Sequence, residues 1–455
     1  MKRKLLLLLI ILSNTGIYAQ CWNSISPGYQ NISAIKSDKT LWAWGRNNYG
    51  QLGDGTVIDK NIQVQIGTSA DWQNISVGAQ HTVALKSDGT LWAWGRNNYG
   101  QLGDGTNINK NSPIQVGTDT NWQSISSGPS QTIALKLDGT LWAWGFNDEG
   151  ELGDGTITSK NIPTKIGSDS NWKSISAGWS HTVALKSDGT LWTWGYNPYG
   201  QLGDGTLLGK NTPTKIGIAT DWITISAGGD HTNAIKLDGT LWTWGANFSG
   251  ELGDGTNINK IVPTKIGIET KWASVFAGTD YSIAKKVDGS IWTWGYNSSG
   301  QLGDGTNISK NIPTQIEITS NWLDIYGGYA NGFAVKNDGT LWGWGYNSHE
   351  QLLDGTLINK STPILISCSS LGINELKLAN KSFRIYPNPV KDFLYIENSI
   401  NQSIDKIIII DFSGKIVYNQ NGNHTELNVQ HLQQGTYLLK IFIGGKISQK
   451  KFIKD

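Results

Sequence analysis

The sequence contains little methionine and cysteine, and its charges almost cancel. Its 455 residues include one Met, two Cys, 37 basic and 36 acidic residues, which give a formal net charge of +1. Such a balance produces no strong basic or acidic field, so neither nucleic acid nor an anionic membrane surface is expected as a partner. Long apolar runs are also lacking. Residues 5–12 form the only conspicuous run, and it is too short to span a bilayer.

The first 19 residues have the pattern of an export signal. A basic start at residues 2–4 precedes the apolar run, and residues 17–19 (Ile-Tyr-Ala) offer a small residue at a cleavage point before Gln20. We therefore expect residues 1–19 to be a signal peptide and the chain to be secreted. Acylation of Cys21, as in a lipoprotein, is disfavoured because Gln20 stands where a small residue is expected.

Tryptophan and glycine, in contrast, are abundant, with 22 and 56 residues. All but one of the tryptophans recur on a strict period of 50 residues: one Trp opens each unit, and a Trp-x-Trp-Gly motif follows. Such strict repetition indicates one supersecondary unit copied seven times, each copy burying its apolar faces against its neighbours. The opening residues are Trp22, Trp72, Trp122, Trp172, Trp222, Trp272 and Trp322, and the motifs begin at Trp42, Trp92, Trp142, Trp192, Trp242, Trp292 and Trp342.

The second unit shows how each copy is built. Asp88-Gly89 is a strong hairpin signal between two strand-like segments. Trp92 and Trp94 share one face of a strand whose other face is also apolar, and Pro113 suits an edge strand. Four antiparallel strands per unit, arranged radially, predict an all-β fold: a seven-bladed β-propeller of four-stranded blades over residues 20–368. The expected strands are residues 72–76, 81–86, 90–94 and 113–116.

The two end units are expected to close the ring. No strand of the Pro-x-x-Ile type precedes Trp22, whereas the last unit ends with such a strand at residues 363–366. We therefore predict that this last strand completes the sheet that begins at Trp22, so that no blade edge stays open. The end units are also the irregular ones, because Lys39, Glu350 and Leu353 replace turn and loop glycines.

Each unit resembles the repeat of the regulator of chromosome condensation. In the second unit the matching residues are 91–95 (Leu-Trp-Ala-Trp-Gly), Asn97 and 100–106 (Gly-Gln-Leu-Gly-Asp-Gly-Thr), and residues 78–85 match the other half of the repeat. The resemblance covers residues 22–366. It implies a seven-bladed propeller that acts as a protein-interaction scaffold. The kelch repeat has a similar period, but its double-glycine signature is missing from most units.

The best-known member of that family is a nuclear nucleotide-exchange factor for a small GTPase. We do not expect this activity here. An export signal removes the chain from that partner, and no exchange residue can be matched to a position of this sequence.

A different module follows the last repeat. Residues 369–382 are polar and are expected to be a linker, and residues 383–455 contain candidate strands at 407–410, 415–418, 425–429 and 437–442. This module resembles the C-terminal sorting domain of the type IX secretion system. The matching residues are 386–389 (Tyr-Pro-Asn-Pro), 411–415 (Asp-Phe-Ser-Gly-Lys), 435–437 (Gly-Thr-Tyr) and the basic end around Lys450 and Lys451.

The resemblance implies a small β-sandwich that engages the secretion machinery and routes the chain across the outer membrane of a Gram-negative bacterium. The mature protein would then be released or attached to the outer cell surface. An ordinary appended β-domain is the alternative, since many folds share such strands.

No catalytic, metal-binding or cofactor-binding constellation is found. One Asp before Gly-Thr recurs in each unit, from Asp54 to Asp354, without the alternating oxygen ligands of a calcium loop, so a turn-forming role is expected. His81, His181 and His231 occupy one position of three different units and do not converge as zinc ligands do. We interpret them as hydrogen-bonded structural residues, and we expect neither an enzyme nor a cofactor.

The positions that vary between units indicate a binding surface. The loop between the first and second strands and the loop between the third and fourth strands must emerge on the same face of an antiparallel blade. Tyr, Trp and Arg, which dominate binding hot spots, gather in these loops. The predicted binding residues are Tyr29, Arg46, Tyr49, Arg96, Tyr99, Phe146, Trp179, Tyr196, Tyr199, Phe248, Tyr296, Tyr329 and Tyr346.

An extracellular protein is the expected partner of this face, as for some secreted bacterial propellers that resemble this repeat and inhibit an extracellular enzyme. A glycan is the second candidate, because aromatic faces with Asp and Asn neighbours also suit sugars. A lyase or hydrolase with a site in the channel mouth ranks last. The alternative to all three is that exposed aromatic residues merely cover loop backbone.

The two cysteines are predicted to form a disulfide that joins the ends of the ring. Seven units of 50 residues bring position 371 back onto position 21, so Cys368 lies three positions from Cys21 around the ring. Two unpaired buried thiols are the alternative. In the chain-entropy model so long a loop contributes about 5 kcal/mol of stability. Mass spectrometry of unreduced tryptic peptides is expected to detect the linked pair, and free thiols at both positions would contradict it.

Overall fold

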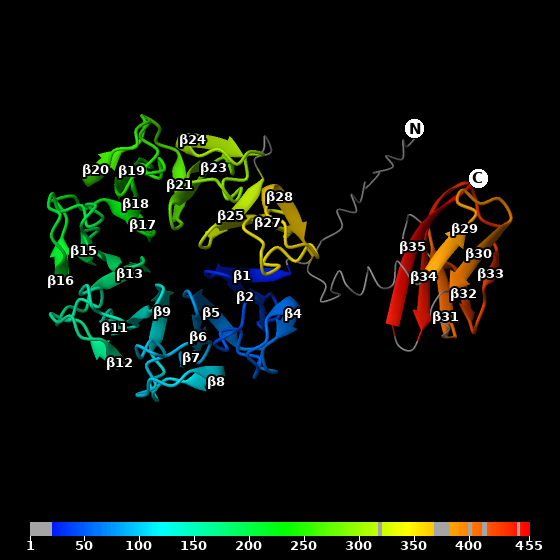
Figure 1. Ribbon diagram of the computed structural model, residues 1–455, viewed down its shortest axis with the longest axis horizontal. Coiled ribbons are helices and arrows are strands. Elements are labelled where there is room, and N and C mark those ends of the chain that lie inside the picture. The colour runs from blue at the N-terminus through cyan, green and yellow to red at the C-terminus, as the bar shows by residue number, and fades with distance from the viewer. Residues whose placement is uncertain (1–20, 317–320, 368–382, 399–402, 412–415, 444–445) are drawn as a thin grey trace, which may run out of the picture. The chain divides into compact units, whose positions relative to one another are not determined.

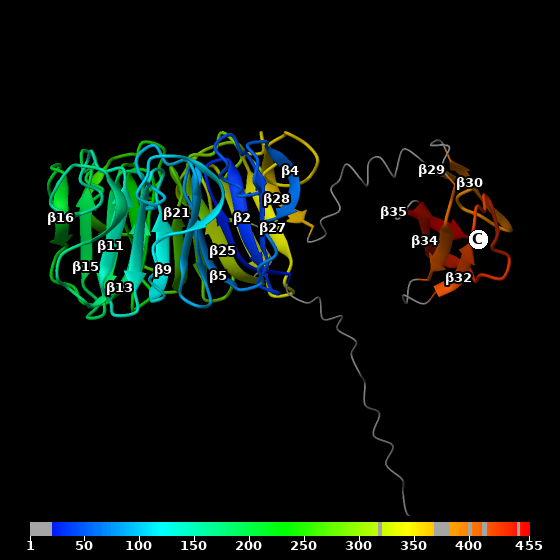
Figure 2. The same cartoon turned by 90° about the horizontal axis from the view of Figure 1, so that it is seen from below.

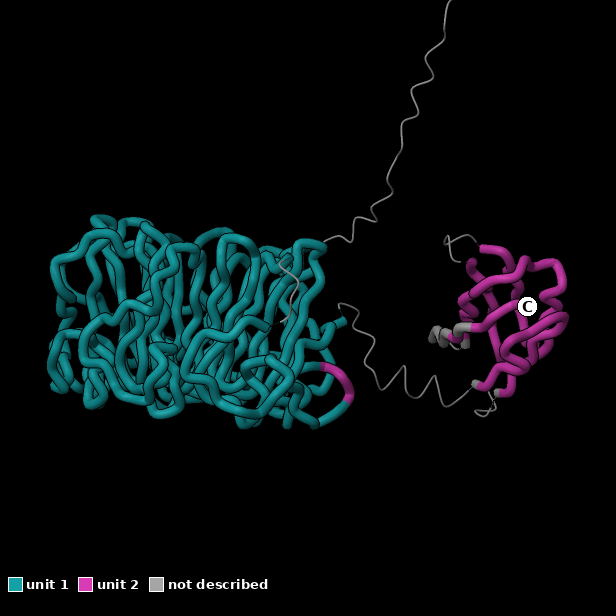
Figure 3. The backbone as a smooth tube through the Cα atoms, turned by 90° about the horizontal axis from the view of Figure 1, so that it is seen from above, with its two compact units in different colours: residues 1–352, 356–368 teal, residues 353–355, 369–455 magenta. Residues whose placement is uncertain are grey.

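The computed structural model describes residues 21–316, 321–367, 383–398, 403–411, 416–443 and 446–455. Within these ranges the regular elements are strands, which form seven consecutive four-stranded sheets, then a three-stranded and a further four-stranded sheet. The chain divides into two compact units, one of residues 1–352 and 356–368 and the other of residues 353–355 and 369–455 (Figure 3). None of the described residues belongs to a helix long and apolar enough to cross a membrane. The predicted signal peptide, the linker and Cys368 lie outside the described residues.

Each of the seven sheets is one blade of four consecutive antiparallel strands, so the predicted seven-bladed propeller is confirmed. The first strand of each blade lies nearest the central axis (Figure 1), and the strands run between the two faces of the ring (Figure 2). The first strands are β1 (Trp22–Pro27), β5 (Trp72–Val77), β9 (Trp122–Ser127), β13 (Trp172–Ala177), β17 (Trp222–Ala227), β21 (Trp272–Ala277) and β25 (Trp322–Gly327). The second strands are β2 (Asn31–Lys36), β6 (His81–Lys86), β10 (Gln131–Lys136), β14 (His181–Lys186), β18 (His231–Lys236), β22 (Tyr281–Lys286) and β26 (Asn331–Lys336).

The third and fourth strands lie towards the periphery of the ring (Figure 1). The third strands are β3 (Leu41–Gly45), β7 (Leu91–Gly95), β11 (Leu141–Gly145), β15 (Leu191–Gly195), β19 (Leu241–Gly245), β23 (Ile291–Gly295) and β27 (Leu341–Gly345). The fourth strands are β4 (Lys60–Gln65), β8 (Lys110–Gln115), β12 (Lys160–Lys165), β16 (Lys210–Lys215), β20 (Lys260–Lys265), β24 (Lys310–Ile316) and β28 (Lys360–Ile366). The recurring proline lies in this outer edge strand, where a missing N–H breaks no ladder hydrogen bond.

The hydrophobic core lies between the blades. At the first interface Ile35, Leu41 and Leu52 of the first blade pack against Trp72 and Trp94 of the second. Equivalent clusters fill the next five interfaces. Because both faces of every sheet are covered in this way, both faces of the third strand are apolar, as the sequence predicts.

The second Trp of each motif binds the neighbouring blade through its indole N–H. Trp94 is fully buried, and its Nε1–H donates to the Gln51 carbonyl of the preceding blade at 3.0 Å. The Thr82 hydroxyl donates to the same oxygen at 2.9 Å. The other six indole bonds, of 2.8–2.9 Å, join Trp144 to Gln101, Trp194 to Glu151, Trp244 to Gln201, Trp294 to Glu251, Trp344 to Gln301 and Trp44 to Gln351.

The other two tryptophans of each unit hold a lysine between them. The ammonium of Lys86 lies 5.0 Å from the ring centroid of Trp72 and 4.7 Å from that of Trp92. In the second to sixth units an acidic residue completes this site, as in the 3.3 Å ion pair of Lys86 with Asp71. Because the lysine is almost buried, its cation–π contacts contribute more than exposed ones would, about 1–2 kcal/mol. The tryptophans therefore recur every 50 residues because each blade needs the same three tryptophan contacts.

The ring closes without exchange of a strand, so the prediction that residues 363–366 complete the first sheet is wrong. β28 pairs with β27 of its own blade, and the first blade has its own outer strand, β4. Each unit already contains four strands, and the innermost strand that begins at Trp22 needs none before it. The first and last blades are joined instead by the bond from Trp44 to the Gln351 carbonyl and by a bond from the Gln63 side chain to the Ser367 carbonyl.

A ring of serines links the innermost strands around the channel. The hydroxyl of Ser26 accepts a 2.9 Å hydrogen bond from the N–H of Val77 in the next blade. The same bond recurs at Ser76, Ser126, Ser176 and Ser226. Phe276 and Tyr326 replace the last two serines, and the residues across from them are Gly327 and Pro27. Pro27 has no N–H to satisfy, so Tyr326 leaves no donor without a partner there.

Backbone strain is concentrated in the same end units. Among the described residues, Lys39, Glu350 and Leu353 are the non-glycine residues with positive φ, at 63°, 55° and 50°. Other units have glycine at these positions. Gly103 shows why: its φ is 74°, and an added Cβ would lie 2.8 Å from the Trp144 indole nitrogen. The irregular residues thus keep the backbone conformation of the repeat at a cost of about 1 kcal/mol or more each.

The second unit contains two sheets that share one core. β29 (Phe383–Tyr386), β30 (Phe393–Asn398) and β33 (Glu426–Asn428) form one sheet, and β32 (Ile416–Asn421), β31 (Lys406–Ile410), β34 (Gly435–Ile443) and β35 (Lys446–Lys454) form the other. Buried residues of both sheets, including Leu394, Leu427, Ile407 and Leu439, belong to one cluster. This is the expected β-sandwich, although β29, β30 and β35 were missing from the candidate strands.

The indole hydrogen bond between the last and first blades is expected to contribute as much to the free energy of unfolding as the indole bonds between the other blades. We predict that Trp44→Phe and Trp94→Phe each lower the free energy of unfolding by about 1–3 kcal/mol, because each removes one donor and part of a buried ring. Chemical denaturation followed by circular dichroism measures both losses, with Leu237→Ala at an exposed turn as the control. A loss for Trp94→Phe without one for Trp44→Phe would mean that the ring is open in solution.

Candidate binding face

Two sets of loops meet on one face of the propeller. In every blade the N–H of the residue after the third strand donates to the carbonyl of the residue before the second strand. Arg96 and Gln80 form this bond at 2.8 Å, and Arg46 and Gln30 form it at 2.9 Å. Tyr29 and Arg46 therefore lie on the same rim, as the antiparallel pattern predicts. We call the surface made by residues 28–30, residues 46–59 and their equivalents in the other blades the loop face.

The long loop between the third and fourth strands is fixed by its own side chains. Asn97 accepts from the Leu102 N–H at 3.0 Å and donates to Asp104 at 2.9 Å. Asp104 also accepts from the Thr106 N–H at 3.0 Å and pairs with Lys110 at 3.2 Å. The predicted turn-forming role of the recurring Asp is confirmed. Within the described part of the chain, no group of three or more His, Cys, Asp or Glu residues could hold a metal ion.

The recurring histidines are buried links between blades. His81, His181 and His231 contact the hydroxyls of Thr132, Thr232 and Ser282 in the next blade at 3.0–3.1 Å. Burial lowers the pKa of each imidazole to about 3. These residues are therefore neutral at ordinary pH, and their predicted structural role is confirmed.

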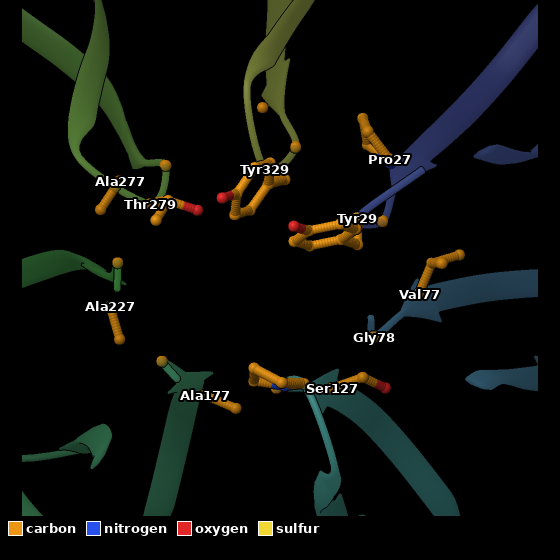
Figure 4. A pocket seen from close by; sticks show the side chains of 18 of the residues that line it. Pro27, Tyr29, Val77, Gly78, Ser127, Ala177, Ala227, Ala277, Thr279 and Tyr329 are labelled. Atoms are coloured by element: carbon orange, nitrogen blue, oxygen red, sulfur yellow. The ribbon is translucent and has the colours of Figure 1, made fainter. Parts of the chain in front are cut away.

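Three of the predicted binding residues converge on the central axis. Tyr29, Trp179 and Tyr329 occupy the same position of the first, fourth and seventh repeats and all line the axial cavity. The ring centroids of Tyr29 and Tyr329 are 3.9 Å apart, and those of Trp179 and Tyr329 are 6.0 Å apart with planes inclined by 10°. We call these three residues the aromatic trio. Figure 4 shows Tyr29 and Tyr329 side by side at the edge of the opening.

Other predicted residues form contacts between adjacent blades farther from the axis. The rings of Tyr99 and Phe146 are 4.8 Å apart, and those of Tyr199 and Phe248 are 5.3 Å apart. Each pair joins neighbouring blades, and the members of each pair hold one another in a fixed orientation. Phe248 is still 63% exposed, so these contacts do not remove its ring from solvent.

The two arginines are held by neighbouring side chains. The guanidinium of Arg96 lies 5.1 Å from the ring centroid of Tyr49 and donates to the Gln80 side chain at 2.7 Å. Arg46 donates to the Gln30 side chain, which in turn donates to the Tyr346 hydroxyl at 3.3 Å. Of the remaining predicted residues, Tyr196 packs against Tyr199 and Tyr296 is exposed.

The axial cavity has a volume of about 380 Å³ and a neutral lining. Its wall consists mainly of the small residues of the innermost strands, among them Ser127, Ala177, Ala227 and Ala277 (Figure 4). Phe276 and Tyr326 are the large exceptions within the wall, and the aromatic trio lies where the wall meets the loop face. The cavity therefore combines narrow, uncharged walls with three aromatic rings at one end.

Acidic residues of the loop face were absent from the predicted set. Asp230 accepts a 3.0 Å hydrogen bond from Gln201 of the preceding blade. Burial and the neighbouring carboxylate of Asp280 raise the pKa of Asp230 to about 6. Asp280 follows Thr279, which lines the cavity. Their variation between repeats was visible in the sequence, but it did not show that Asp230 and Asp280 lie close together.

Two fully buried glutamates were not predicted from the sequence. Glu151 and Glu251 stand where the other five units have Gln. The carboxylate of Glu151 accepts from the Glu149 N–H at 3.0 Å, and that of Glu251 accepts from the Ser249 N–H at 2.7 Å. Burial raises the pKa of both groups to about 7. The exchange of Gln for Glu at one position of the repeat was the signal that could have revealed them.

The ring of tryptophan-linked blades with its variable loops on one face places the protein in the class of seven-bladed propellers. The model described as the RCC1-like domain matches residues 115–381, which is more than half of the chain. The chain therefore belongs to the family of RCC1-like domains. Models of the regulator of chromosome condensation (RCC1) repeat match residues 38–85, 88–135 and 72–101. The model described as the secretion system C-terminal sorting domain matches residues 384–455 and indicates type IX secretion to the surface or the medium.

Solved structures agree with this fold. Human WBSCR16 superposes with a TM-score of 0.66 at 21% identity, over 72% of this chain and 94% of that one. Prp20p from Saccharomyces cerevisiae superposes with a TM-score of 0.64 at 21% identity, over 80% of this chain and 90% of that one. At these identities the likeness concerns the fold alone. No curated protein matches the sequence.

The buried glutamates lead to a prediction about pH. Because their folded pKa of about 7 exceeds the usual 4.5, the folded chain binds more protons between these values and loses stability as the pH rises through them. We expect Glu151→Gln and Glu251→Gln each to stabilise the protein at pH 8, by at most about 3 kcal/mol, and to have little effect at pH 4. Denaturation at both pH values measures this, and Gln51→Glu is the reverse control. The buried histidines make the stability of the whole protein rise with pH, opposite to the glutamates. Each variant is therefore compared with the unmodified protein at the same pH, once at pH 4 and once at pH 8. Equal effects at pH 4 and pH 8 would contradict the assignment.

Proposed function

We propose that the propeller is a secreted, non-enzymatic binding protein whose loop face contacts an extracellular protein. The observation that carries the proposal is the placement of thirteen Tyr, Trp, Phe and Arg side chains on one face. The opposite face has short turns of nearly constant sequence, such as Asp88-Gly89. Large aromatic side chains and arginine are the residues that supply most of the binding energy at protein interfaces.

The contacts within the face favour binding over mere covering of the backbone. Trp179 and Phe248 keep 41% and 63% of their surface exposed although each packs against another ring. Side chains held by neighbours lose little conformational freedom when a partner binds, which lowers the entropic cost of association. The long loops beneath them are fixed by the Asn and Asp bonds described above, so the whole face is preorganised.

A glycan is the second candidate ligand. The exposed Trp179 ring at the cavity, with acidic residues in the neighbouring loops, also suits a sugar ring and its hydroxyl groups. Exchange of nucleotide on a small GTPase and binding of nucleic acid are not proposed. The loop face offers no set of lysines and arginines for phosphates, and the sorting domain directs the chain away from cytoplasmic partners. The secretion machinery is proposed as the partner of residues 383–455.

Capture of a partner from culture medium tests the proposal. We expect the tagged full-length chain to retain an extracellular protein and Trp179→Ala to weaken this binding by at least about tenfold, since a hot-spot aromatic residue carries 2 kcal/mol or more. Leu237→Ala is the matched control, because this exposed apolar residue lies in a turn on the opposite face. Retention of the same protein by Trp179→Ala and by Phe248→Ala would contradict the loop face as the binding site. Retention of a glycan and no protein would favour the second candidate.

A further inference from the structure

The aromatic trio has no structural need for large rings. The same position of the repeat holds Ala79, Pro129, Gly229 and Thr279 in the other four blades, which have the same fold. Trp179 belongs to the fourth blade and Tyr329 to the seventh, so the two rings approach one another from different sides of the axial cavity. Trp179 is 41% exposed. These rings therefore form an open aromatic site where the cavity meets the loop face.

Two carboxylates lie beside this site. Asp280 directly follows the cavity residue Thr279, and its carboxylate contributes to the raised pKa of Tyr329, after the hydrogen-bonded Tyr29 and burial. Asp230 directly follows the cavity residue Gly229 of the preceding blade, whose N–H donates to the Thr279 carbonyl at 3.1 Å. Among the residues that the structure describes, no lysine or arginine forms an ion pair with either Asp.

This unpaired negative charge contrasts with the long loops. In the first six blades the recurring Asp of the long loop pairs with the lysine that begins the fourth strand, as Asp104 does with Lys110. The lysine at the end of the second strand has an acidic partner in the second to sixth blades, as Lys186 has Asp169 at 2.6 Å. Arg46 and Arg96 are bound to Gln30 and Gln80 in the first two blades. The Asp residues of these long loops are thus paired with lysine, whereas Asp230 and Asp280 at the cavity form no ion pair among the described residues.

Aromatic faces and carboxylates together attract a cation. A lysine ammonium or an arginine guanidinium over Tyr and Trp rings gains about 0.5–2 kcal/mol, most when it is partly desolvated. The cavity walls are neutral, so a charge placed deep inside would lose its hydration without compensation. The charge must therefore stay between the rings and the carboxylates, while the aliphatic stem that carries it packs against the adjoining apolar lining.

We propose that the aromatic trio, with Asp280 and Asp230, binds a lysine or arginine side chain that the protein partner projects into the mouth of the axial cavity. This inference rests on the proposed function for the source of the side chain, and it names the chemical group that anchors the partner. The aromatic pairs farther out, such as Tyr199 with Phe248, then contact the partner surface around that anchor.

A small probe tests the site without the partner. Binding of Nα-acetyl-lysine N-methylamide to the full-length protein is measured by saturation-transfer NMR and compared with the norleucine analogue, which has a similar stem without the charge. We expect the lysine probe to bind at least about threefold more tightly. Trp179→Ala and Asp280→Asn should each abolish this preference. Asp148→Asn, an exposed acidic residue of the third blade on the same face, should leave it unchanged.

The outcomes separate this inference from the proposed function. Equal binding of the two probes, or binding of N-acetylglucosamine without binding of the lysine probe, would overturn the cation site. If Trp179→Ala loses the captured partner whereas Asp280→Asn retains it at full affinity, the loop face binds a protein but the anchor is not a cation. If the lysine probe binds as expected and no protein is captured, the proposed function fails and the cation site stands. Near-ultraviolet circular dichroism shows whether each variant keeps its tryptophan packing.

Discussion

Every interface between blades depends on an indole N–H that reaches a backbone carbonyl in the preceding blade. A loop carbonyl removed from water needs a donor, and a Trp at the second motif position provides that donor together with a large apolar surface. The other two tryptophans surround a nearly buried lysine, whose charge is met by two aromatic rings and, in the second to sixth blades, by one acidic side chain. Because these contacts hold the ring together, substitutions are tolerated mainly at positions that lie outside the interfaces between blades. Variation between the repeats is therefore confined mostly to the loop face and to the channel.

The same division explains how a rigid framework can carry a specific surface. Asn97 and its equivalents fix each long loop from within, so the residues that follow the third strand are free to differ. Arg, Phe, Tyr and Ala all occupy that position, and the backbone bond to the neighbouring loop persists in every case. Specificity can thus change by single substitutions on a surface whose backbone does not move, which is the usual advantage of placing binding residues on loops above a stable scaffold.

The fold could be predicted almost entirely, because the 50-residue period of Trp indicates that the same four-stranded unit and the same contacts between units occur seven times. The error at the ring closure arose because an outer strand was sought before Trp22, although the first unit ends with its own outer strand, Lys60–Gln65. The sequence also predicted that Tyr29 and Arg46 lie on one face, because the first and third loops of an antiparallel blade emerge on the same side. It did not show that Tyr29, Trp179 and Tyr329 meet, because contacts near the axis depend on side-chain length and on the width of the ring. The buried Glu151 and Glu251 were missed because burial of a loop position is decided by the neighbouring blade.

The seventh blade lacks two kinds of hydrogen bond that most of the other blades form with their neighbours. Its serine link is lost on both sides, at Phe276 and at Tyr326, and the threonine hydroxyl that reaches the loop carbonyl elsewhere is replaced by Gly332 in this blade and by Ile32 in the next. Two of the three strained residues, Glu350 and Leu353, lie in the same blade. Amide protons there should exchange with solvent soonest, and thermal opening of the closed circle should begin there and spread to the better-linked blades. A covalent link between Cys21 and Cys368, if it forms as predicted, would join the two ends of the ring and limit such opening.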